Sequence, residues 1–381
     1  MSPRLRLILA TVSLLALAGC AGVPPRPASA PPSSAAALAP PSVAPSTSAA
    51  APAAAPDEAA FVRALVAEHP ELDAQRVTAL LQQATVQPSI LAAMARPAEA
   101  RPWRDYRPIF VNAQRIEAGA AFYRKHRERI DATATRYGVP PTILVALLGV
   151  ETSYGRITGR YRVLDALVTL GFHYPPRAAF FQKELAALLT LPADRLPAPV
   201  QELRGSYAGA MGWCQFMPSS LARYGVDADG DGRVDLWNSL PDILASTANY
   251  LAAHGWQAGQ PVSAPAWPAA AAAPPPAAMV WAGKPPVQPL QAFEALGYVP
   301  ATRVDPALPA ALLSLQGADG PEWRFVFPDF YVLTRYNTSP LYALAVSELA
   351  DAIATRSADA AGGANDAADS GTPAPAPGRR P

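Results

Sequence analysis

Charge and cysteine are both scarce in this chain. Only 16% of its 381 residues are charged, and two are cysteines, whereas roughly 25% of an ordinary soluble domain is charged. The formal net charge of +1 excludes the basic surface that nucleic-acid-binding proteins need, so we expect no nucleic-acid partner. Two cysteines cannot form a disulfide framework. The four histidines have no metal-ligand spacing and no Ser-His-Asp grouping.

Proline, by contrast, is abundant, with 44 residues in uneven clusters. Residues 21–56 contain ten prolines among alanines and serines, a single charge at Arg26 and no aromatic side chain. A segment of this kind buries too little apolar surface to offset the entropy of ordering it. We therefore predict that 21–56 and the similar tail 357–381 are disordered and that 57–356 fold.

The first twenty residues are typical of a secretory signal peptide. Arg4 and Arg6 precede an apolar run at 7–17 that is too short to span a bilayer. The ending Leu-Ala-Gly-Cys resembles a bacterial lipobox. That resemblance implies cleavage before Cys20 and lipidation of its thiol, so that Cys20 is a membrane anchor. The alternative is an ordinary secreted signal with a chance cysteine.

Lipidation of Cys20 gives the proline-rich segment a role. Residues 21–56 become a semi-rigid tether that extends by about 3.1 Å per residue in the polyproline conformation. By resemblance to lipoprotein sorting, Ala21 after the cysteine indicates the outer membrane. We therefore expect a lipid-anchored protein on the periplasmic face of the outer membrane.

Helical periodicity dominates the rest of the chain. Asp57 is a candidate N-cap, and the apolar spacing after it predicts a first helix. The other expected helices are 73–84, 111–137, 141–151, 178–190, 218–224, 241–254 and 340–355. Residues 101–110 hold two prolines and are predicted to be extended, whereas 311–316 and 323–335 are rich in β-branched and aromatic residues and are predicted to be strands.

These elements predict an α+β fold that is mainly α. A helical flank and core at 57–256 would be followed by a small antiparallel β insertion at 257–335, which an Ala/Pro-rich stretch introduces. The last segment, 336–356, would return as a helix to the helical body.

Glu151 is the first candidate catalytic residue. It ends PTILVALLGVE, a helix that is apolar on every side and therefore predicted to be buried. Burial and the negative end of the helix dipole both disfavour a carboxylate, so they raise its pKa, as a general acid near neutral pH requires. A glutamate that simply emerges into solvent is the alternative.

Several long motifs now occur in a consistent order. They are ILVALLGVETSYG, GSYAGAMGWCQFMPSS at 205–220, the aspartate loop at 227–238, ANYL at 248–251 and RYNTS at 335–339. Together they resemble the membrane-bound lytic murein transglycosylase B family over nearly all of 57–355. The resemblance implies a lysozyme-like helical core with a helical flank and a small β domain, and a peptidoglycan glycan strand as the partner.

In that family a single glutamate acts first as an acid and then as a base. The resemblance implies that Glu151 protonates the oxygen between N-acetylmuramic acid and N-acetylglucosamine and then deprotonates the muramoyl C6 hydroxyl, so that a 1,6-anhydro end forms. The two-carboxylate arrangement of most glycosidases would need a second acid. Asp165, Glu184 and Glu202 lie in segments without a matching apolar setting.

The resemblance also implies the lining of the saccharide groove. The residues concerned are Ser206, Gln215, Phe216, Tyr106, Tyr250, Tyr336 and Asn337. Where the family usually has Asp-Tyr-Pro-Arg-Arg, this chain has His-Tyr-Pro-Pro-Arg at 173–177. Arg177 alone remains to contact a substrate carboxylate.

The aspartate loop has calcium-loop spacing. Asp227, Asp229, Asp231 and Asp235 stand at positions 1, 3, 5 and 9, Gly232 at position 6 allows the turn, and Arg233 at position 7 would offer its backbone carbonyl. Asn238 at position 12 replaces the bidentate carboxylate, so we expect a weaker structural calcium site that water or Asp242 completes. A hydrated acidic turn without an ion is the alternative.

Two other functions remain open at this point. A non-catalytic peptidoglycan-binding lipoprotein has no use for a buried acid, and a hydrolytic muramidase would release a reducing end. Cys214 lies inside the glycine-rich motif without a visible activating charge, so we predict a small buried residue rather than a nucleophile. We expect no organic cofactor, and no motif indicates a protein partner.

Overall fold

The computed structural model describes residues 57–94, 101–270 and 272–369. The predicted signal peptide, the lipidation site Cys20 and the tether at 21–56 lie outside the described residues. Among the residues that are described, no helix is both long enough and apolar enough to cross a membrane.

The described chain is mainly helical, with a five-stranded sheet at one end and a separate two-stranded pair formed by β1 and β2. The helices are α1 (Glu58–Glu68), α2 (Ala74–Leu81), α3 (Pro88–Met94), α4 (Trp103–Phe110), α5 (Ala113–Tyr137), α6 (Pro141–Thr152), α7 (Val163–His173), α8 (Ala178–Thr190), α9 (Pro218–Tyr224), α10 (Leu240–Ala253), α11 (Gln291–Glu294), α12 (Pro328–Tyr336) and α13 (Pro340–Asp369). The strands are β1 (Tyr161–Arg162), β2 (Arg204–Gly205), β3 (Ser263–Pro268), β4 (Gln288–Pro289), β5 (Tyr298–Pro300), β6 (Pro309–Gln316) and β7 (Pro321–Val326).

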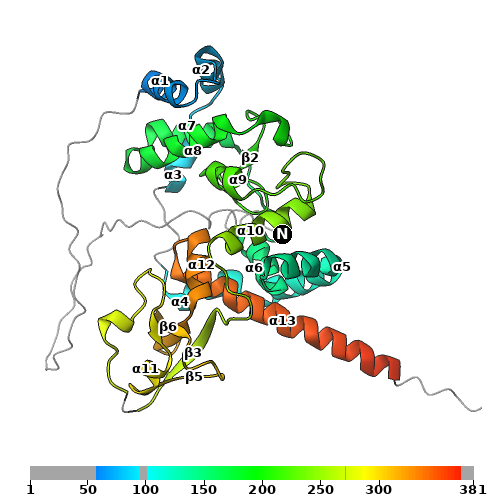
Figure 1. Cartoon of the computed structure of the whole chain (residues 1–381), viewed down its shortest axis with the longest axis vertical. Coiled ribbons are helices and arrows are strands. Elements are labelled where there is room, and N and C mark those ends of the chain that lie inside the picture. Colours follow the sequence, from blue (N-terminus) through cyan, green and yellow to red (C-terminus); the bar gives the residue numbers. More distant parts are fainter. Residues whose placement is uncertain (1–56, 95–100, 271, 370–381) are drawn as a thin grey trace, which may run out of the picture.

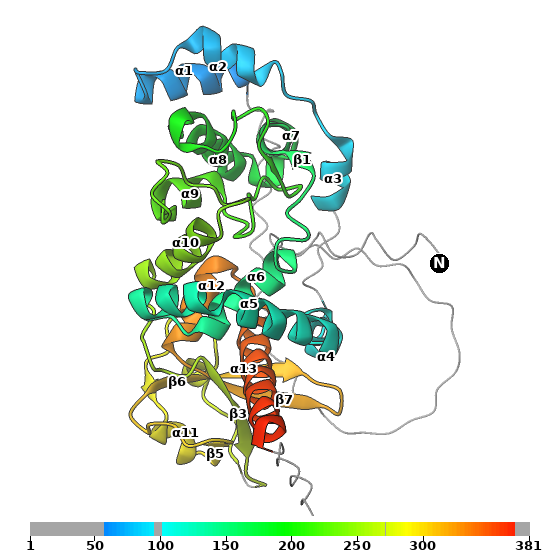
Figure 2. The ribbon, with the colours of Figure 1, turned by 90° about the vertical axis from the view of Figure 1, so that its right-hand side faces the viewer.

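These elements are stacked along the long axis of the molecule. Helices α1 and α2 lie at one end, α5, α6 and α10 lie in the middle, and the sheet lies at the other end (Figure 1 and Figure 2). The predicted helices at 178–190, 218–224 and 241–254 are confirmed as α8, α9 and α10. The predicted fold, α+β and mainly α with a small antiparallel insertion, is confirmed as well.

Capping residues fix the ends of several helices where the sequence predicts them. The carboxylate of Asp57 accepts the backbone N–H of Ala59 at the start of α1, and Asp73 does the same for α2. Gly138 ends α5 at φ 68°, a left-handed conformation that glycine adopts without a steric cost. Helix α6 is buried along nearly its whole length, as its all-apolar sequence predicts.

The segment 101–110, predicted to be extended, is a helix instead. Pro102 lies at the N-cap of α4, where its fixed φ is compatible with a helix start, and Pro108 lies inside the helix. The buried side chains Trp103, Tyr106 and Phe110 recur with helical spacing on one face. Burial of these three large rings outweighs the one backbone hydrogen bond that Pro108 cannot make.

The sheet of the β insertion is antiparallel and has the strand order β4-β6-β7-β3-β5. Its central pair joins Ala311 to Val326 and Gln316 to Pro321 at the two ends of a continuous ladder. Strand β6 confirms the strand predicted at 311–316.

The segment 323–335, predicted to be one strand, divides at a proline. Strand β7 ends at Val326, and Pro328 is the first residue of helix α12. Proline cannot donate to a strand ladder but is favourable at the first position of a helix. Helix α12 then buries Phe330 and Leu333, so its aromatic and β-branched residues pack as a helix face.

The last helix is longer than predicted. Helix α13 begins at Pro340, as expected, but it continues beyond Thr355 to Asp369, into the tail predicted to be disordered. This tail is rich in alanine, the strongest helix former, and has no proline before Pro373. The alanine-rich first part of the tail therefore favours a helix, although the prolines from Pro373 onward make the tail as a whole resemble a disordered segment.

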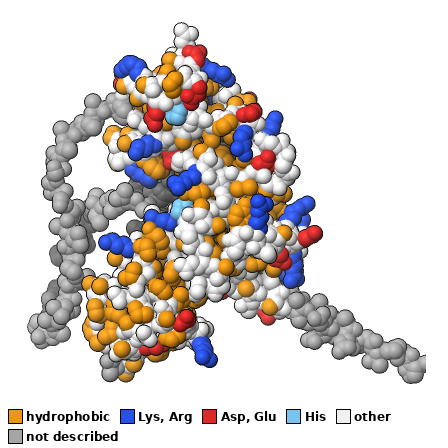
Figure 3. Space-filling model, in the orientation of Figure 1, with side chains coloured by type: hydrophobic (Ala, Val, Ile, Leu, Met, Phe, Trp, Pro, Cys, Tyr) orange, Lys and Arg blue, Asp and Glu red, His pale blue; other side chains and the backbone are white. Residues whose placement is uncertain are grey.

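Two apolar clusters hold the molecule together. The larger one includes the helices together with the face of β6 and β7 that carries Leu313 and Val326. The smaller one lies on the other face of the sheet, around Phe293, Phe325 and Phe327. Figure 3 shows that hydrophobic side chains also gather at the surface of the sheet end.

Candidate active site

Glu151 lies in the last turn of the buried helix α6, with only 9% of its surface exposed. The hydroxyl of Tyr342, in the first turn of α13, donates a hydrogen bond of 2.5 Å to Glu151 Oε1. Burial, followed by the nearby Glu151, raises the pKa of Tyr342 well above that of a free phenol. Tyr342 therefore stays protonated and acts as a permanent donor to the carboxyl group.

An aromatic wall stands beside this carboxyl group. The ring of Phe216 lies 5.5 Å from that of Tyr250 and 5.8 Å from that of Tyr336. The Tyr336 hydroxyl donates to the backbone carbonyl of Cys214 at 2.7 Å, and the Tyr250 hydroxyl donates to that of Arg335 at 2.5 Å. The structure thus brings together three of the predicted groove residues from three separate parts of the chain.

The glycine-rich loop after β2 is held by its own polar groups. The Ser206 hydroxyl accepts the backbone N–H groups of Ala208 and Ala210, and Gln215 Nε2 donates to the carbonyls of Thr158 and Gly212. A Cβ atom at Gly205 would lie 2.1 Å from the carbonyl oxygen of Ala210, so only glycine permits this turn. Both predicted polar residues therefore also shape the loop.

Two other predicted groove residues are deeply buried. Asn337 follows α12, and its side-chain oxygen accepts the backbone N–H of Ser339 at the start of α13. Tyr106, in α4, has 1% of its surface exposed and stacks between Trp103 and Phe110. It lies close enough to Tyr342 to contribute to the raised pKa of that phenol. Tyr106 thus reaches the site through Tyr342.

Arg177 lies in a short turn before α8. Its guanidinium group stands over the rings of Phe180 and Phe181, 4.4 Å and 5.3 Å from their centres. Burial lowers its pKa, and Tyr174 and Tyr207 offset part of that effect. It forms no ion pair with any carboxylate of the described residues. Its nearness to Tyr207 places it beside the loop that carries Ser206.

Cys214 is a buried packing residue, as predicted. Its Sγ lies 3.4 Å from the carbonyl oxygen of Ile243 and 3.2 Å from the hydroxyl of Thr247. Burial raises the pKa of the thiol to about 12, which keeps it protonated and excludes a thiolate nucleophile near neutral pH.

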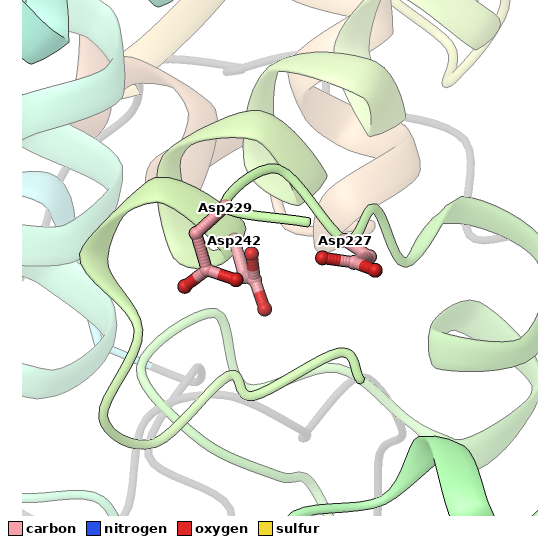
Figure 4. A group of neighbouring side chains, drawn as sticks. All are labelled: Asp227, Asp229 and Asp242. Atoms are coloured by element: carbon pink, nitrogen blue, oxygen red, sulfur yellow. The ribbon is translucent and has the colours of Figure 1, made fainter. Parts of the chain in front are cut away.

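Three carboxylates of the aspartate-loop region converge. One oxygen each of Asp227, Asp229 and Asp242 lies within 4.8 Å of the others. Figure 4 shows Asp229 beside Asp242, with Asp227 facing them across the loop. Asp242 is fully buried in the first turn of α10 and accepts the backbone N–H groups of Ala228 and Asp235, both at 2.8 Å. Three oxygens at this spacing fit a hard divalent cation.

The remaining predicted ligands serve the loop backbone. The Asp231 carboxylate accepts the backbone N–H of Arg233. The Asp235 carboxylate accepts the backbone N–H groups of Trp237 and Asn238. The Asn238 amide donates to Asp235 as well. None of these side chains belongs to the group of three, whose third carboxylate is Asp242.

Tyr342 is the residue of the site that sequence analysis missed. It lies on a buried, otherwise apolar stripe of α13 together with Ala345 and Leu349, and all three side chains are fully buried. A tyrosine in such a stripe needs a hydrogen-bond partner for its hydroxyl. That requirement is the one signal in the sequence that Tyr342 faces a polar group.

The fold and the site define a class. A buried glutamate at the end of a core helix, beside a cluster of aromatic rings in a lysozyme-like α+β fold, suits an enzyme that cleaves glycan chains. The family model described as "Transglycosylase SLT domain" matches residues 55–351. The chain belongs to this family, and it is a peptidoglycan lytic transglycosylase.

Individual relatives agree with this assignment. The chain is 36% identical to membrane-bound lytic murein transglycosylase B from Escherichia coli K12 over 309 residues, which cover 78% of this chain and 83% of the relative. The structure of soluble lytic transglycosylase SltB1 from Pseudomonas aeruginosa is 40% identical and superimposes with a TM-score of 0.71, over 79% of this chain and 99% of that one.

Two further solved relatives carry ligands. The E. coli lytic transglycosylase Slt35 in complex with calcium is 36% identical and has a TM-score of 0.69, over 78% of this chain and 93% of that one. SltB3 from P. aeruginosa in complex with NAG-NAM-pentapeptide is 32% identical and has a TM-score of 0.66, over 77% of this chain and 78% of that one.

Proposed function

We propose that this transglycosylase cleaves the β-1,4 bond between N-acetylmuramic acid and N-acetylglucosamine without water and leaves 1,6-anhydromuramoyl ends. The observation that carries the proposal is the burial of Glu151 at the end of an apolar helix, where Tyr342 donates a hydrogen bond to it. Burial and the carboxyl end of α6 disfavour a negative charge at this position. These two effects favour the protonated acid that the first step of the proposed reaction needs, whereas the hydrogen bond from Tyr342 favours the carboxylate that the second step needs.

The other acidic residues weighed as partners have separate structural duties. Asp165 pairs with Arg162 at 2.6 Å, and Glu184 accepts the backbone N–H and the hydroxyl of Ser219 at the start of α9. Glu202 is exposed. These engagements support a mechanism with one carboxyl group, which favours transglycosylation over the two-carboxylate hydrolysis of a muramidase.

One carboxyl group serves both halves of the reaction. Glu151 donates its proton to the glycosidic oxygen, and the bond from that oxygen to the muramoyl C1 breaks. The resulting carboxylate then removes the proton of the C6 hydroxyl while the C6 oxygen bonds to C1. Glu151 ends the cycle protonated, and the product lacks the water molecule that hydrolysis adds.

The proposed substrate is a peptidoglycan glycan strand. SltB3, a relative of this chain, binds NAG-NAM-pentapeptide, a fragment of that polymer. We propose that Phe216, Tyr250 and Tyr336 form a wall of the saccharide groove, with Ser206, Gln215 and Asn337 as hydrogen-bonding groups. Arg177 would bind a substrate carboxylate, since its guanidinium group has no acidic partner in the described chain.

The mass of the products tests the reaction. Purified sacculi are digested, and the released muropeptides are measured by mass spectrometry. The expected muropeptides are lighter by one water than hydrolytic products. Reducing ends alone would identify a muramidase and reject the proposal, and the absence of soluble products would identify a non-catalytic peptidoglycan-binding protein.

We propose in addition that Asp227, Asp229 and Asp242 hold a structural calcium ion, which the relative Slt35 also binds. Backbone carbonyl oxygen from Arg233 and water would supplement the three carboxylates. The test is differential scanning calorimetry with calcium or with a chelator. Chelation is expected to lower the Tm of the wild type but not that of Asp229→Asn, whose site is already weakened. An equal Tm in calcium and chelator would reject the site.

We propose finally that Cys20 is lipidated and that the enzyme is anchored at the periplasmic face of the outer membrane. The motif at 17–20 supports this location, and a relative is membrane-bound by name. Fractionation of wild type and Cys20→Ser tests the anchor. The wild type is expected in the outer membrane and the variant in the soluble fraction; an unchanged distribution would reject lipid anchoring.

A further inference from the structure

Two arginines converge on Ser153, two residues after the catalytic glutamate. Arg115 Nη2, from the first turn of α5, donates to the Ser153 hydroxyl at 3.3 Å. Arg156 Nε, from the loop after α6, donates to the Ser153 carbonyl at 3.1 Å. Ser153 itself has φ 51°, a left-handed conformation that costs a non-glycine residue energy and often marks a functional site.

Arg115 is an unusual residue to find without an acid. Only 7% of its surface is exposed, and its guanidinium group stands 5.1 Å from the ring centre of Phe110. Its Nη1 is buried and has no hydrogen-bond partner among the described residues. Burial, and then the charge of Arg156, lower the pKa of Arg115, which Tyr154 offsets in part.

Neither guanidinium group has a counter-ion in the described protein. Arg115 and Arg156 are absent from all of its ion pairs. Buried charges in folded proteins are paired, because removing an ion from water is expensive. Two cations that share Ser153 therefore form a site that an anion would complete, with Arg115 at its base and the exposed Arg156 at its rim.

The position of this site relates it to the reaction. The loop from Ser153 to Thr158 follows the end of α6. Its last residue accepts a hydrogen bond at the Thr158 carbonyl from the side chain of Gln215. The ring of Trp213 packs against Gly155 so closely that a Cβ there would lie 2.0 Å from it. The segment that begins at Ser153, two residues after Glu151, is therefore packed against the loop that carries Trp213 and Gln215.

We propose that Arg115, Ser153 and Arg156 form a carboxylate-binding site that receives the stem peptide of the glycan substrate. This inference rests on the proposed function, which supplies a polymer with peptide carboxylates. Guanidinium groups match the planar, two-oxygen geometry of a carboxylate, and charge-assisted hydrogen bonds of this kind are the stronger ones. The site is separate from Arg177, which lies beside Tyr174 and Tyr207 instead.

The experiment compares two substrates that differ only in charge. Soluble glycan strands with stem peptides are used as such, or after their carboxylates have been converted to amides with carbodiimide and ammonia. Wild-type kcat/KM is expected to be about tenfold higher on the native strands, the smaller end of what a hydrogen bond to a charged group contributes. Because Arg177 is retained, Arg156→Gln is expected to lower that preference severalfold rather than abolish it, by raising KM on the native strands alone.

Control variants make the outcome decisive. Arg129→Gln removes another exposed arginine, on α5, which has no ion pair within the described part of the chain, and it is expected to keep the wild-type preference. Arg115→Lys retains a buried charge and is expected to show a reduced preference with an unchanged Tm. An unchanged preference for native strands in Arg156→Gln would overturn the proposal. An equal loss of kcat/KM on native and amidated strands would overturn it as well. Because the readout is a ratio between substrates, it is independent of whether the products are anhydro or reducing ends.

Discussion

The helical core and the β sheet are each built around an apolar cluster, but they place their polar groups differently. The core encloses ionisable side chains such as Glu151 and Asp242. Among the described residues, the strands at 263–326 bury no charged side chain, and the only polar group that they bury is the hydroxyl-bearing ring of Tyr298. The core therefore accepts the energetic cost of burying the groups that do chemistry, whereas the sheet supplies a stable apolar support.

Polar groups return where the two regions meet. Glu348, in α13, pairs with Arg107 of α4 at 2.5 Å and with Arg324 of β7 at 2.6 Å. The hydroxyls of Ser263 in β3 and Ser347 in α13 are 3.0 Å apart. Helix α13 carries Tyr342 into the site and Glu348 to the sheet. The junction thus positions the donor of the catalytic carboxyl group.

The largest expected effect is on the reaction rate, and it comes from a substitution in the core that should leave the stability of the fold almost unchanged. Glu151→Gln removes the proton donor and acceptor and is expected to lower the rate of muropeptide release by about 10²- to 10⁴-fold. The amide preserves the size of the side chain, so the Tm is expected to stay within a few degrees of the wild type. Glu202→Gln, on an exposed residue, is the control. Wild-type rates in Glu151→Gln would end the assignment of this residue.

The next prediction concerns the ion pairs of Glu348, which join the helical core to the sheet. Glu348→Ala removes the carboxylate that pairs with the partly buried Arg324, and the free energy of unfolding is expected to fall by about 3 kcal/mol, the lower end for a broken buried pair. Glu117→Ala is the matched control, because Glu117 also faces two arginines but at an exposed position and should cost at most about 1 kcal/mol. Urea denaturation measures both. Equal losses would show that the junction is no stronger than a surface pair.

A smaller effect concerns the donor to the catalytic carboxyl group. Tyr342→Phe is expected to lower the rate about tenfold, in line with the loss of one hydrogen bond to a charged group. The pH–rate profile should move toward higher pH, because a carboxyl group without that donor holds its proton more tightly. Tyr336→Phe removes a hydroxyl that donates to a backbone carbonyl instead, and its profile should stay in place. A shared shift would deny Tyr342 its specific role.

The smallest effect concerns a buried acid near the junction. Asp329, in the first turn of α12, is fully buried, and burial raises its pKa from 3.8 to about 7. Its Oδ1 accepts the backbone N–H of Gln257. The folded state binds more protons than the unfolded state between these values, so the contribution of Asp329 to stability falls as pH rises from about 4 to about 7.

Asp329→Asn removes this titration. The variant is expected to be more stable than the wild type at pH 8, by about 1 kcal/mol, the cost of one unsatisfied buried polar group. The difference should shrink as the pH falls to 5, where the wild-type acid is protonated. Urea midpoints at both pH values measure it, and a difference that does not depend on pH would contradict the proposed cause.

Sequence patterns predicted those elements whose local preference and packing agree. Helix α6 is apolar on all sides, and Asp57 caps α1, so both followed from the residues alone. The prediction for 101–110 was wrong for two reasons: Pro102 lies at the N-cap of α4, where proline is tolerated, and the burial of Trp103, Tyr106 and Phe110 outweighs the cost of Pro108 inside the helix. The division at Pro328 was missed because one run of aromatic residues suits a strand and a buried helix face equally.

The site was likewise predictable only where sequence motifs mark its residues, and not where long-range contacts bring them together. Glu151 and the groove residues came from motifs, whereas Tyr342 depends on a contact 191 positions away in the chain, which periodicity does not record. The third carboxylate of the aspartate loop, Asp242, was considered because it is near in sequence. The pair Arg115 and Arg156 required the folded chain, since 38 positions separate Arg115 from Ser153.

The inert thiol of Cys214 has a practical consequence. It is the only cysteine among the described residues, it is completely buried, and its pKa of about 12 keeps it unreactive toward maleimides at neutral pH. In a soluble form that lacks Cys20, a cysteine introduced on the surface of α13 and another on β3 would accept fluorophores selectively. Energy transfer between the two dyes would then report directly whether the sheet moves against the helical core during turnover.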